Sequence, residues 1–93
     1  MEGKVKVHNL RVQSPEEAQD IVLEKLKAGY GRGMEVNFLK TELETDLADG
    51  RKFWVVEGEL KVRRWLFLKK TWHFTYFVDA EEGRILIMRG KKG

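Results

Sequence analysis

Residues 51–79, RKFWVVEGELKVRRWLFLKKTWHFTYFVD, decide the fold that this sequence specifies. They contain all three tryptophans and four of the five phenylalanines of the chain. Apolar and polar residues alternate on both sides of a short basic and aromatic segment, which is typical of two strands that each bury one face. We therefore predict a long β-hairpin, with strands over 52–64 and 70–79, at the centre of a curled sheet.

The alternation in this hairpin also predicts which residues face each other. The core positions in both strands are even-numbered: Trp54, Val56, Leu60, Val62, Trp72, Phe74, Tyr76 and Val78. Because residues on one face of a hairpin must pair with one another, the connecting loop must contain an odd number of residues, somewhere within 65–68.

Several agreeing signals predict a helix over 14–28. Ser14 can cap its first turn, Pro15 suits its first position, and Glu17 completes a capping box. The residues of its apolar stripe recur at helical spacing: Ala18, Ile21, Val22 and Leu26. We expect Gly29 to end this helix.

The remaining strands are predicted over 4–12, 34–47 and 84–89. Asp49 and Gly50 are typical of a two-residue hairpin turn, which would place Leu39, Leu43 and Leu47 on one buried face. The cross-strand pairs predicted from this turn are Leu43 with Val56, Leu39 with Leu60, Thr45 with Trp54, and Thr41 with Gly58. At Gly58 we expect a bulge or a close approach of the helix.

The order of elements, β-α-β-β-β-β, predicts one α+β domain over residues 1–93, with a single helix packed on a curled antiparallel sheet of four to five strands. Apolar residues make up 42% of the chain, which is enough for one core. The chain has no cysteine, which excludes disulfides and thiol nucleophiles. No apolar run has the length of a signal peptide or a membrane span, so we expect a cytoplasmic protein.

Charge is distributed unevenly along the chain. Residues 1–50 carry seven basic and ten acidic side chains, whereas residues 51–93 carry eleven and five. Such asymmetry is compatible with an anionic partner. It is equally compatible with lysines that protect strand edges from aggregation.

The segment 75–86, TYFVDAEEGRIL, resembles the C-terminal signature of PepSY-type domains, in which an aromatic strand runs into V-D-A-x-x-G-x-I/V-L. The helix sequence SPEEAQDIVLEKL and residues 54–56 are similar to the same pattern, so the resemblance covers most of 14–88. It implies a cystatin-like fold and a non-enzymatic module, often inhibitory or regulatory toward peptidases. Residues 47–51 lack the Q-x-V-x-G hairpin of cystatins that inhibit cysteine proteases, so that activity is not expected.

Few residues could carry catalytic chemistry. Ser14 is the one serine, and a role as helix cap accounts for it. His8 and His73 are the two histidines and lie far apart in the sequence. A nucleophile with an adjacent base is therefore not expected.

Two acidic groupings are possible on the predicted sheet. His73 would lie opposite Glu59 or Lys61, and with Glu57 and Glu59 it could form either a loose cation site or a solvated polar row. Glu42 and Glu57 could face each other, which would raise the pKa of one of them. Because no base or cleft accompanies either grouping, we predict no enzyme activity, no metal site and no cofactor.

The tip of the long hairpin is a first candidate binding surface. Its residues combine cations with large apolar side chains: Arg63, Arg64, Trp65, Phe67, Lys69 and Lys70. This combination suits a nucleic acid or a lipid surface, and also suits a protein contact. Alternatively, part of the tip folds over the open end of the core.

The face of the sheet opposite the helix is a second candidate surface. Phe53, Val55 and Phe77 fall on that face, and we place Leu86 and Met88 of the last strand with them. Exposed apolar area is unfavourable at roughly 25 cal/mol per Å², so we expect it to be covered by a second copy of the chain. The sequence thus predicts a non-catalytic binding or regulatory module that acts through protein contacts, with an unidentified protein partner or as a homodimer. The alternative is a nucleic-acid-binding protein that uses the tip at 63–70.

Overall fold

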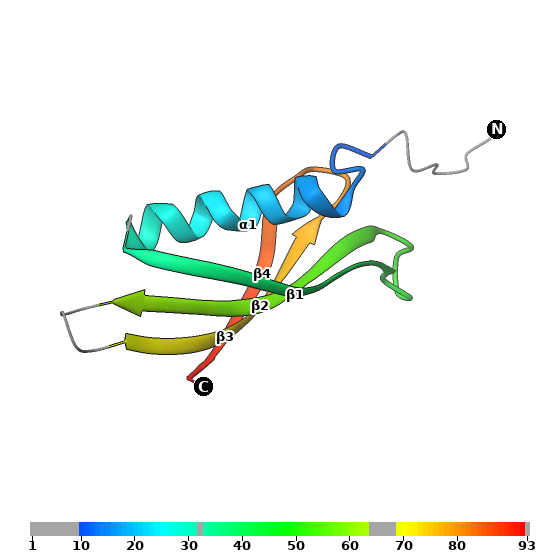
Figure 1. The fold of residues 1–93 in the computed structure, drawn as a ribbon. Helices are drawn as coiled ribbons and strands as arrows, with labels where there is room; N and C mark the ends of the chain where they lie inside the picture. Colours follow the sequence, from blue (N-terminus) through cyan, green and yellow to red (C-terminus); the bar gives the residue numbers. More distant parts are fainter. Residues whose placement is uncertain (1–9, 32, 64–68, 93) are drawn as a thin grey trace.

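The computed structural model describes residues 10–31, 33–63 and 69–92, apart from the side chains at 63, 69, 70 and 87–92. In chain order these residues form α1 (Pro15–Tyr30), β1 (Met34–Thr45), β2 (Lys52–Arg63), β3 (Lys69–Asp79) and β4 (Ile85–Lys92). The strands form one antiparallel sheet in the order β1-β2-β3-β4, and α1 lies along one side of it (Figure 1). The predicted α+β class, with one helix on a four-stranded antiparallel sheet, is confirmed for the described residues.

A fifth strand was predicted over 4–12, but the described residues of this segment, 10–12, do not form one. Residues 4–9 lie outside the description, and residues 10–12 have no strand conformation. Leu10 and Val12 are nevertheless buried. The Val12 amide donates to the Ala80 carbonyl oxygen at 2.9 Å, and the Trp54 indole Nε1 donates to the Val12 carbonyl oxygen at 2.9 Å. Single hydrogen bonds and apolar packing therefore hold this segment, instead of a strand ladder.

The helix begins as predicted and ends later than predicted. Ser14 is the N-cap, and its Oγ accepts a hydrogen bond from the Glu17 amide at 3.2 Å. Ala18, Val22 and Leu26 are fully buried against the sheet, and Ile21 packs at the edge of the same cluster. Gly29 was expected to end α1, but the helix continues to Tyr30. Gly31 is the residue with positive φ (76°), and its amide donates to the Lys27 carbonyl oxygen, so it is the one that closes the last turn.

The central hairpin has the predicted pairing of even-numbered core residues. Trp54 pairs with Val78, Val56 with Tyr76, and Leu60 with Trp72. The last pair is Arg63 with Lys69, so the strands start and end within one residue of the predicted bounds. The connecting residues 64–68 lie outside the described part of the chain.

The pairing of β1 with β2 differs from the prediction by two residues. Leu43 lies opposite Trp54 rather than Val56, and Thr45 lies opposite Lys52. The turn is longer than two residues, because the Asp46 amide donates to the Arg51 carbonyl oxygen at 2.8 Å. Carboxylates of Asp46 and Asp49 accept backbone amides inside the turn, and this local bonding favours the wider loop.

A β-bulge in β1 explains the second error in this strand. The pairing skips from Phe38 to Lys40, so Leu39 has no partner. One extra residue moves every later side chain to the other face. The core-facing residues are therefore Met34, Val36 and Phe38 before the bulge, and Thr41 and Leu43 after it. Leu39, which was predicted to be buried, is the bulge residue and is 55% exposed. Leu47, also predicted to be buried, lies in the turn beyond the end of β1 and is 99% exposed.

The bulge expected at Gly58 is confirmed, because the pairing of β1 with β2 shifts directly beside this residue. Gly58 is also a point of close approach, but its neighbours are other strand residues and not the helix. A Cβ at this position would lie 2.6 Å from Cζ of Phe74 and 2.7 Å from the carbonyl oxygen of Asn37. Phe38 and Phe74 lie opposite Gly58 on the two neighbouring strands, and their rings meet edge to face with centroids 6.2 Å apart. The space above Gly58 is thus filled by aromatic rings from both sides.

Candidate interaction surface

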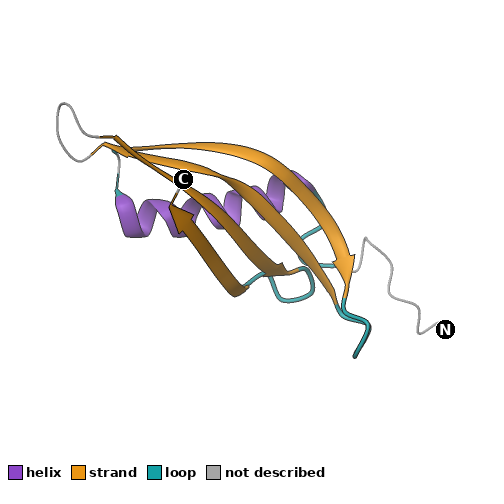
Figure 2. Cartoon of the chain, turned by 90° about the horizontal axis from the view of Figure 1, so that it is seen from below, coloured by secondary structure: helices purple, strands orange, loops and turns teal. Residues whose placement is uncertain are grey.

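Helix α1 covers one face of the sheet. In the described part of the chain, no helix or strand covers the opposite face. Figure 1 shows α1 above the strands, and Figure 2 shows the strands as one curved layer with the helix on a single side. Residues that alternate with the core positions of β2 and β3 point to the uncovered side, which we call the outer face.

Four apolar residues form a cluster on the outer face near the β3–β4 turn. We call Phe53, Val55, Phe77 and Leu86 the outer patch. The rings of Phe53 and Phe77 stack with centroids 5.7 Å apart and an interplanar angle of 7°, and Val55 pairs directly with Phe77. Phe53, Val55 and Phe77 are partly buried by one another, whereas Leu86 is 47% exposed. Phe53, Val55 and Phe77 are therefore preassembled on the two central strands, β2 and β3, and Leu86 belongs to the edge strand β4.

The pairing of β3 with β4 shows how the last strand meets this patch. Phe77 lies opposite Ile87, and Tyr76 lies opposite Met88. A shift of register between Phe77 and Val78 leaves Leu86 without a partner. Met88, which the sequence placed with the outer patch, thus lies in the row of Tyr76, a buried residue, while Ile87 lies in the row of Phe77. The side chains at 87 and 88 lie outside the described atoms.

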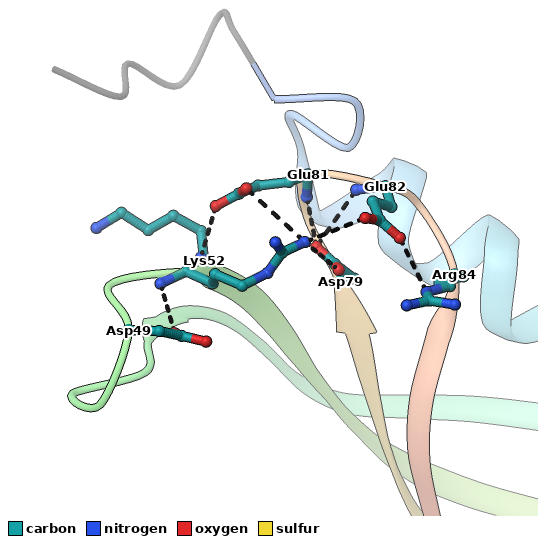
Figure 3. Close-up of polar contacts among 7 residues, drawn as sticks. Asp49, Lys52, Asp79, Glu81, Glu82 and Arg84 are labelled. Carbon is teal, nitrogen blue, oxygen red and sulfur yellow. Dashed lines mark hydrogen bonds and ion pairs between the residues drawn. The ribbon is translucent and has the colours of Figure 1, made fainter. Parts of the chain in front are cut away.

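A buried carboxylate organises the end of the sheet beside the outer patch. Asp79 is 2% exposed, and its Oδ2 accepts a hydrogen bond from Nη2 of Arg51 at 2.7 Å. Its Oδ1 accepts the backbone amides of Glu81 at 2.8 Å and Glu82 at 3.3 Å. Figure 3 shows Asp79, Glu81 and Glu82 gathered at this turn. Asp79 therefore joins the start of β2 to the β3–β4 turn.

The electrostatics of this pair keep both groups charged. Burial alone would raise the pKa of Asp79, but the hydrogen bonds from Arg51 and from the two amides outweigh it, so the pKa lies below its ordinary value. The hydrogen bond with Asp79 raises the pKa of the Arg51 guanidinium further. A permanently ionised and fully hydrogen-bonded carboxylate is suited to structural anchoring, and not to proton transfer at neutral pH.

A recess of about 360 Å³ lies where the outer patch meets this charged cluster. Phe53 and Leu86 contribute apolar walls to it, and Arg51, Asp79 and Arg84 contribute charged ones. Apolar residues surrounded by a polar and charged rim have the usual anatomy of a protein contact surface.

The rest of the outer face is polar, and its pairing corrects one prediction. Glu57 lies opposite Lys40, and Glu42 lies opposite Val55, so the two glutamates do not face each other. The longer turn after Thr45 causes this difference, because it sets the register of the residues from Lys40 to Thr45. Glu59 does lie opposite His73, with 3.8 Å between Glu59 Oε2 and His73 Nε2. Within 10–31, 33–62 and 71–86, no group of three potential ligands is close enough to hold a metal ion.

The predicted hairpin tip lies mostly outside the described part of the chain. Arg64, Trp65 and Phe67 lie outside the described residues, and Arg63, Lys69 and Lys70 are described only by their backbone. The pairs Arg63 with Lys69 and Val62 with Lys70 place these three at the end of the hairpin.

Comparison with known proteins gives no match to a family model, to a curated protein or to a solved structure. Within the described residues, α1 is too short and too polar to cross a bilayer.

Proposed function

We propose that this chain is a non-catalytic binding module that acts through protein–protein contact at the outer patch, and that it self-associates there. The observation that carries the proposal is the stacked pair Phe53 and Phe77, together with Val55 and the 47% exposed Leu86, on the face that α1 leaves open. In the described structure nothing else packs on this patch.

Aromatic side chains held rigidly on a surface favour binding, because little conformational entropy remains to be lost when a partner arrives. The stack restrains both rings before any contact forms. Removing the exposed part of the patch from water would contribute roughly 25 cal/mol per Å². The neighbouring arginines and carboxylates provide the rim that excludes water and sets orientation.

The contacts of Asp79 and His73 support a non-catalytic role. Asp79 is engaged by three donors, and His73 is exposed beside Glu59 without a further described ion-pair partner. The resemblance of residues 75–86 to PepSY-type domains supports the same role, since it implies a regulatory module with a cystatin-like fold.

The test is sedimentation velocity at micromolar concentration. We expect the wild type to form dimers and Phe77→Ser and Leu86→Ser to weaken them at least tenfold, since each places a polar group in the contact. Leu39→Ser is the matched control, because Leu39 is similarly exposed (55%) but lies at the β1 bulge. A monomeric wild type, or equal effects of Leu86→Ser and Leu39→Ser, would contradict the proposal.

The alternative function is nucleic-acid binding through the basic and aromatic tip at 63–70. The observation in its favour is the excess of basic over acidic residues in 51–93, eleven against five. Against it, Phe74 and Tyr76 are buried in the core, whereas single-strand binders display such rings. Retention on RNA or DNA at low salt, lost in an Arg63/Arg64/Lys69/Lys70 alanine variant, would favour this alternative. No retention on either polymer would exclude it.

A further inference from the structure

Charge is divided between the two ends of the sheet. Residues 41–56 and 76–86 form the end that carries the β1–β2 and β3–β4 turns, which we call the turn end. It has seven acidic and three basic residues, although the whole chain has a net charge of +3. The acidic ones are Glu42, Glu44, Asp46, Asp49, Asp79, Glu81 and Glu82, and the basic ones are Arg51, Lys52 and Arg84. At the opposite end, residues 34–38, 58–63 and 69–74 have two acidic and four basic residues. The outer patch thus lies at the acidic end of the molecule.

The cations of the turn end do not cancel its acidity at the outer patch. Arg51 Nη2 lies 2.7 Å from Asp79 Oδ2, and Arg84 Nε lies 3.0 Å from Glu82 Oε1. Each of these arginines is therefore already engaged by a carboxylate. Lys52 alternates with the outer-face residues of β2, and its Nζ donates to a threonine hydroxyl of β1 at 2.6 Å.

Three exposed carboxylates remain without a counter-charge beside the outer patch. Glu44 lies opposite Phe53 on the neighbouring strand. Asp46 and Asp49 line the same recess as Phe53. One oxygen of each aspartate accepts a backbone amide of its own turn, which leaves the other oxygen uncommitted in the described structure. None of the three carboxylates forms an ion pair with a described cation.

An aromatic wall beside free carboxylates suits an arginine side chain. The guanidinium group binds carboxylates through a rigid fork of donors and also stacks on aromatic faces such as that of Phe53. Its aliphatic stem can lie along the exposed Leu86 while the charged head reaches the carboxylates. The recess, of about 360 Å³, has room for one such side chain.

A second copy of the chain does not offer this chemistry at the patch. Because the outer patch lies at the acidic end, contact of patch on patch brings two acidic ends together, whichever way the strands of the two copies run. Apolar contact favours that association, but like charges across an interface oppose it. The charge of the turn end is complementary to a basic partner instead.

We propose that the outer patch and its recess dock a basic and apolar segment of another protein, with an arginine side chain lying between Phe53 and the carboxylates of Asp46 and Asp49. This inference rests on the proposed function, and it names the chemistry of the partner. Because the segment covers the outer patch, it displaces a second copy of the chain.

The probe for this site is a fluorescent peptide that alternates arginine with leucine. Its matched control carries citrulline, which has the shape of arginine without the charge. We expect fluorescence anisotropy at about 50 mM salt to show at least tenfold tighter binding of the arginine peptide. Equal affinities for the two peptides would overturn the proposal.

Asp46→Asn with Asp49→Asn tests the carboxylates. Asparagine keeps the side-chain oxygen that accepts the turn amides, so the double variant loses two charges and retains its turn. We expect the arginine peptide to bind it about tenfold more weakly. The matched control is Glu35→Gln with Glu59→Gln, which removes two charges at the opposite end of the sheet. Circular dichroism verifies that both are folded. An equal loss in the control would assign binding to net charge, and the proposed site would be wrong.

Leu86→Ser separates docking in the recess from attraction by charge alone. We expect it to weaken binding of the arginine peptide severalfold, because Leu86 supplies an apolar wall. An unchanged affinity would mean that the peptide does not occupy the recess, and would overturn the proposal.

Sedimentation velocity distinguishes the failure of this inference from that of the proposed function. If the arginine peptide binds but leaves the wild-type dimer intact, it binds elsewhere, and the inference fails while self-association stands. If the wild type is a monomer and peptide binding still depends on Leu86 and on the two aspartates, self-association is wrong and the inference stands. If neither self-association nor peptide binding depends on Leu86, both proposals are wrong.

Discussion

The two faces of the sheet are built from alternate residues of the same strands, and they differ in what covers them. On the helix side, Val56 and Val78 are 0% exposed and Trp54 is 6% exposed. On the outer side, their neighbours Phe53, Val55 and Phe77 remain partly open. Both sets are equally apolar, so composition does not separate them. Helix α1 and residues 10–12 cover only one face of the sheet, so the apolar residues of that face form the core and stabilise the fold. The apolar residues of the outer face remain available for contact with a partner.

Among substitutions on the two faces, we expect Trp54→Ala to cause the largest loss of stability. Trp54→Ala removes a buried ring and its hydrogen bond to Val12, so we expect a loss of about 3–5 kcal/mol in the free energy of unfolding. Trp72→Ala should have a smaller effect, because Trp72 is only partly buried at the margin of the core. Urea denaturation measures both. Equal losses would mean that the core extends to Trp72 as fully as to Trp54.

A methyl group at Gly58 tests the packing on the helix side. We expect Gly58→Ala to destabilise the fold by about 2–3 kcal/mol, because its Cβ would overlap the Phe74 ring and the Asn37 carbonyl. Gly29→Ala is the control, since it adds the same methyl to α1 with no atom within 4 Å. The control should be neutral or slightly stabilising. A neutral Gly58→Ala would show that the aromatic rings move aside freely.

The stability that the Asp79–Arg51 ion pair contributes should depend on pH. Asp79→Asn removes the charge that pairs with Arg51 and should destabilise the fold by about 1.5–2 kcal/mol at neutral pH. Since the folded-state pKa of Asp79 lies below its ordinary value, the charged pair stabilises the fold above the unfolded pKa and is lost as pH falls through the folded pKa. The difference between wild type and variant should therefore shrink in acid, as denaturation at pH 7 and about pH 3 can show. A constant difference would assign the effect to shape instead of charge.

The smallest effect on stability should come from the outer face. We expect Phe77→Ser to lower the free energy of unfolding by about 1 kcal/mol in dilute solution, because it breaks the stack with Phe53 but opens no buried cavity. At higher concentration, where dimers form, the difference from wild type should grow, since a partner stabilises the folded state. Melting curves at several protein concentrations test this. A loss as large as that of Trp54→Ala would mean that the outer patch belongs to the core.

The two hairpins show where sequence patterns suffice. In β2 and β3 the alternation is unbroken, so even-numbered residues were correctly predicted to share the core. In β1 the bulge at Leu39 adds one residue, and the one sign of it in the sequence is Gly58, beside which the pairing shifts. The error at Leu39 follows from this bulge. The errors at Leu47 and in the Glu42–Glu57 pair follow from the longer turn after Thr45. A second register shift next to Leu86 has the same effect on Met88.

The sequence by itself determined the class of the fold, the start of the helix, the central pairing and the four members of the outer patch, because these depend on local period and caps. Only the tertiary structure decided the burial of Asp79 beside Arg51, the packing of residues 10–12 on Trp54 and the stacking of Phe53 on Phe77. These features join residues distant along the chain. Their geometry depends on bulges and turn hydrogen bonds, which alternation of polar and apolar residues does not encode.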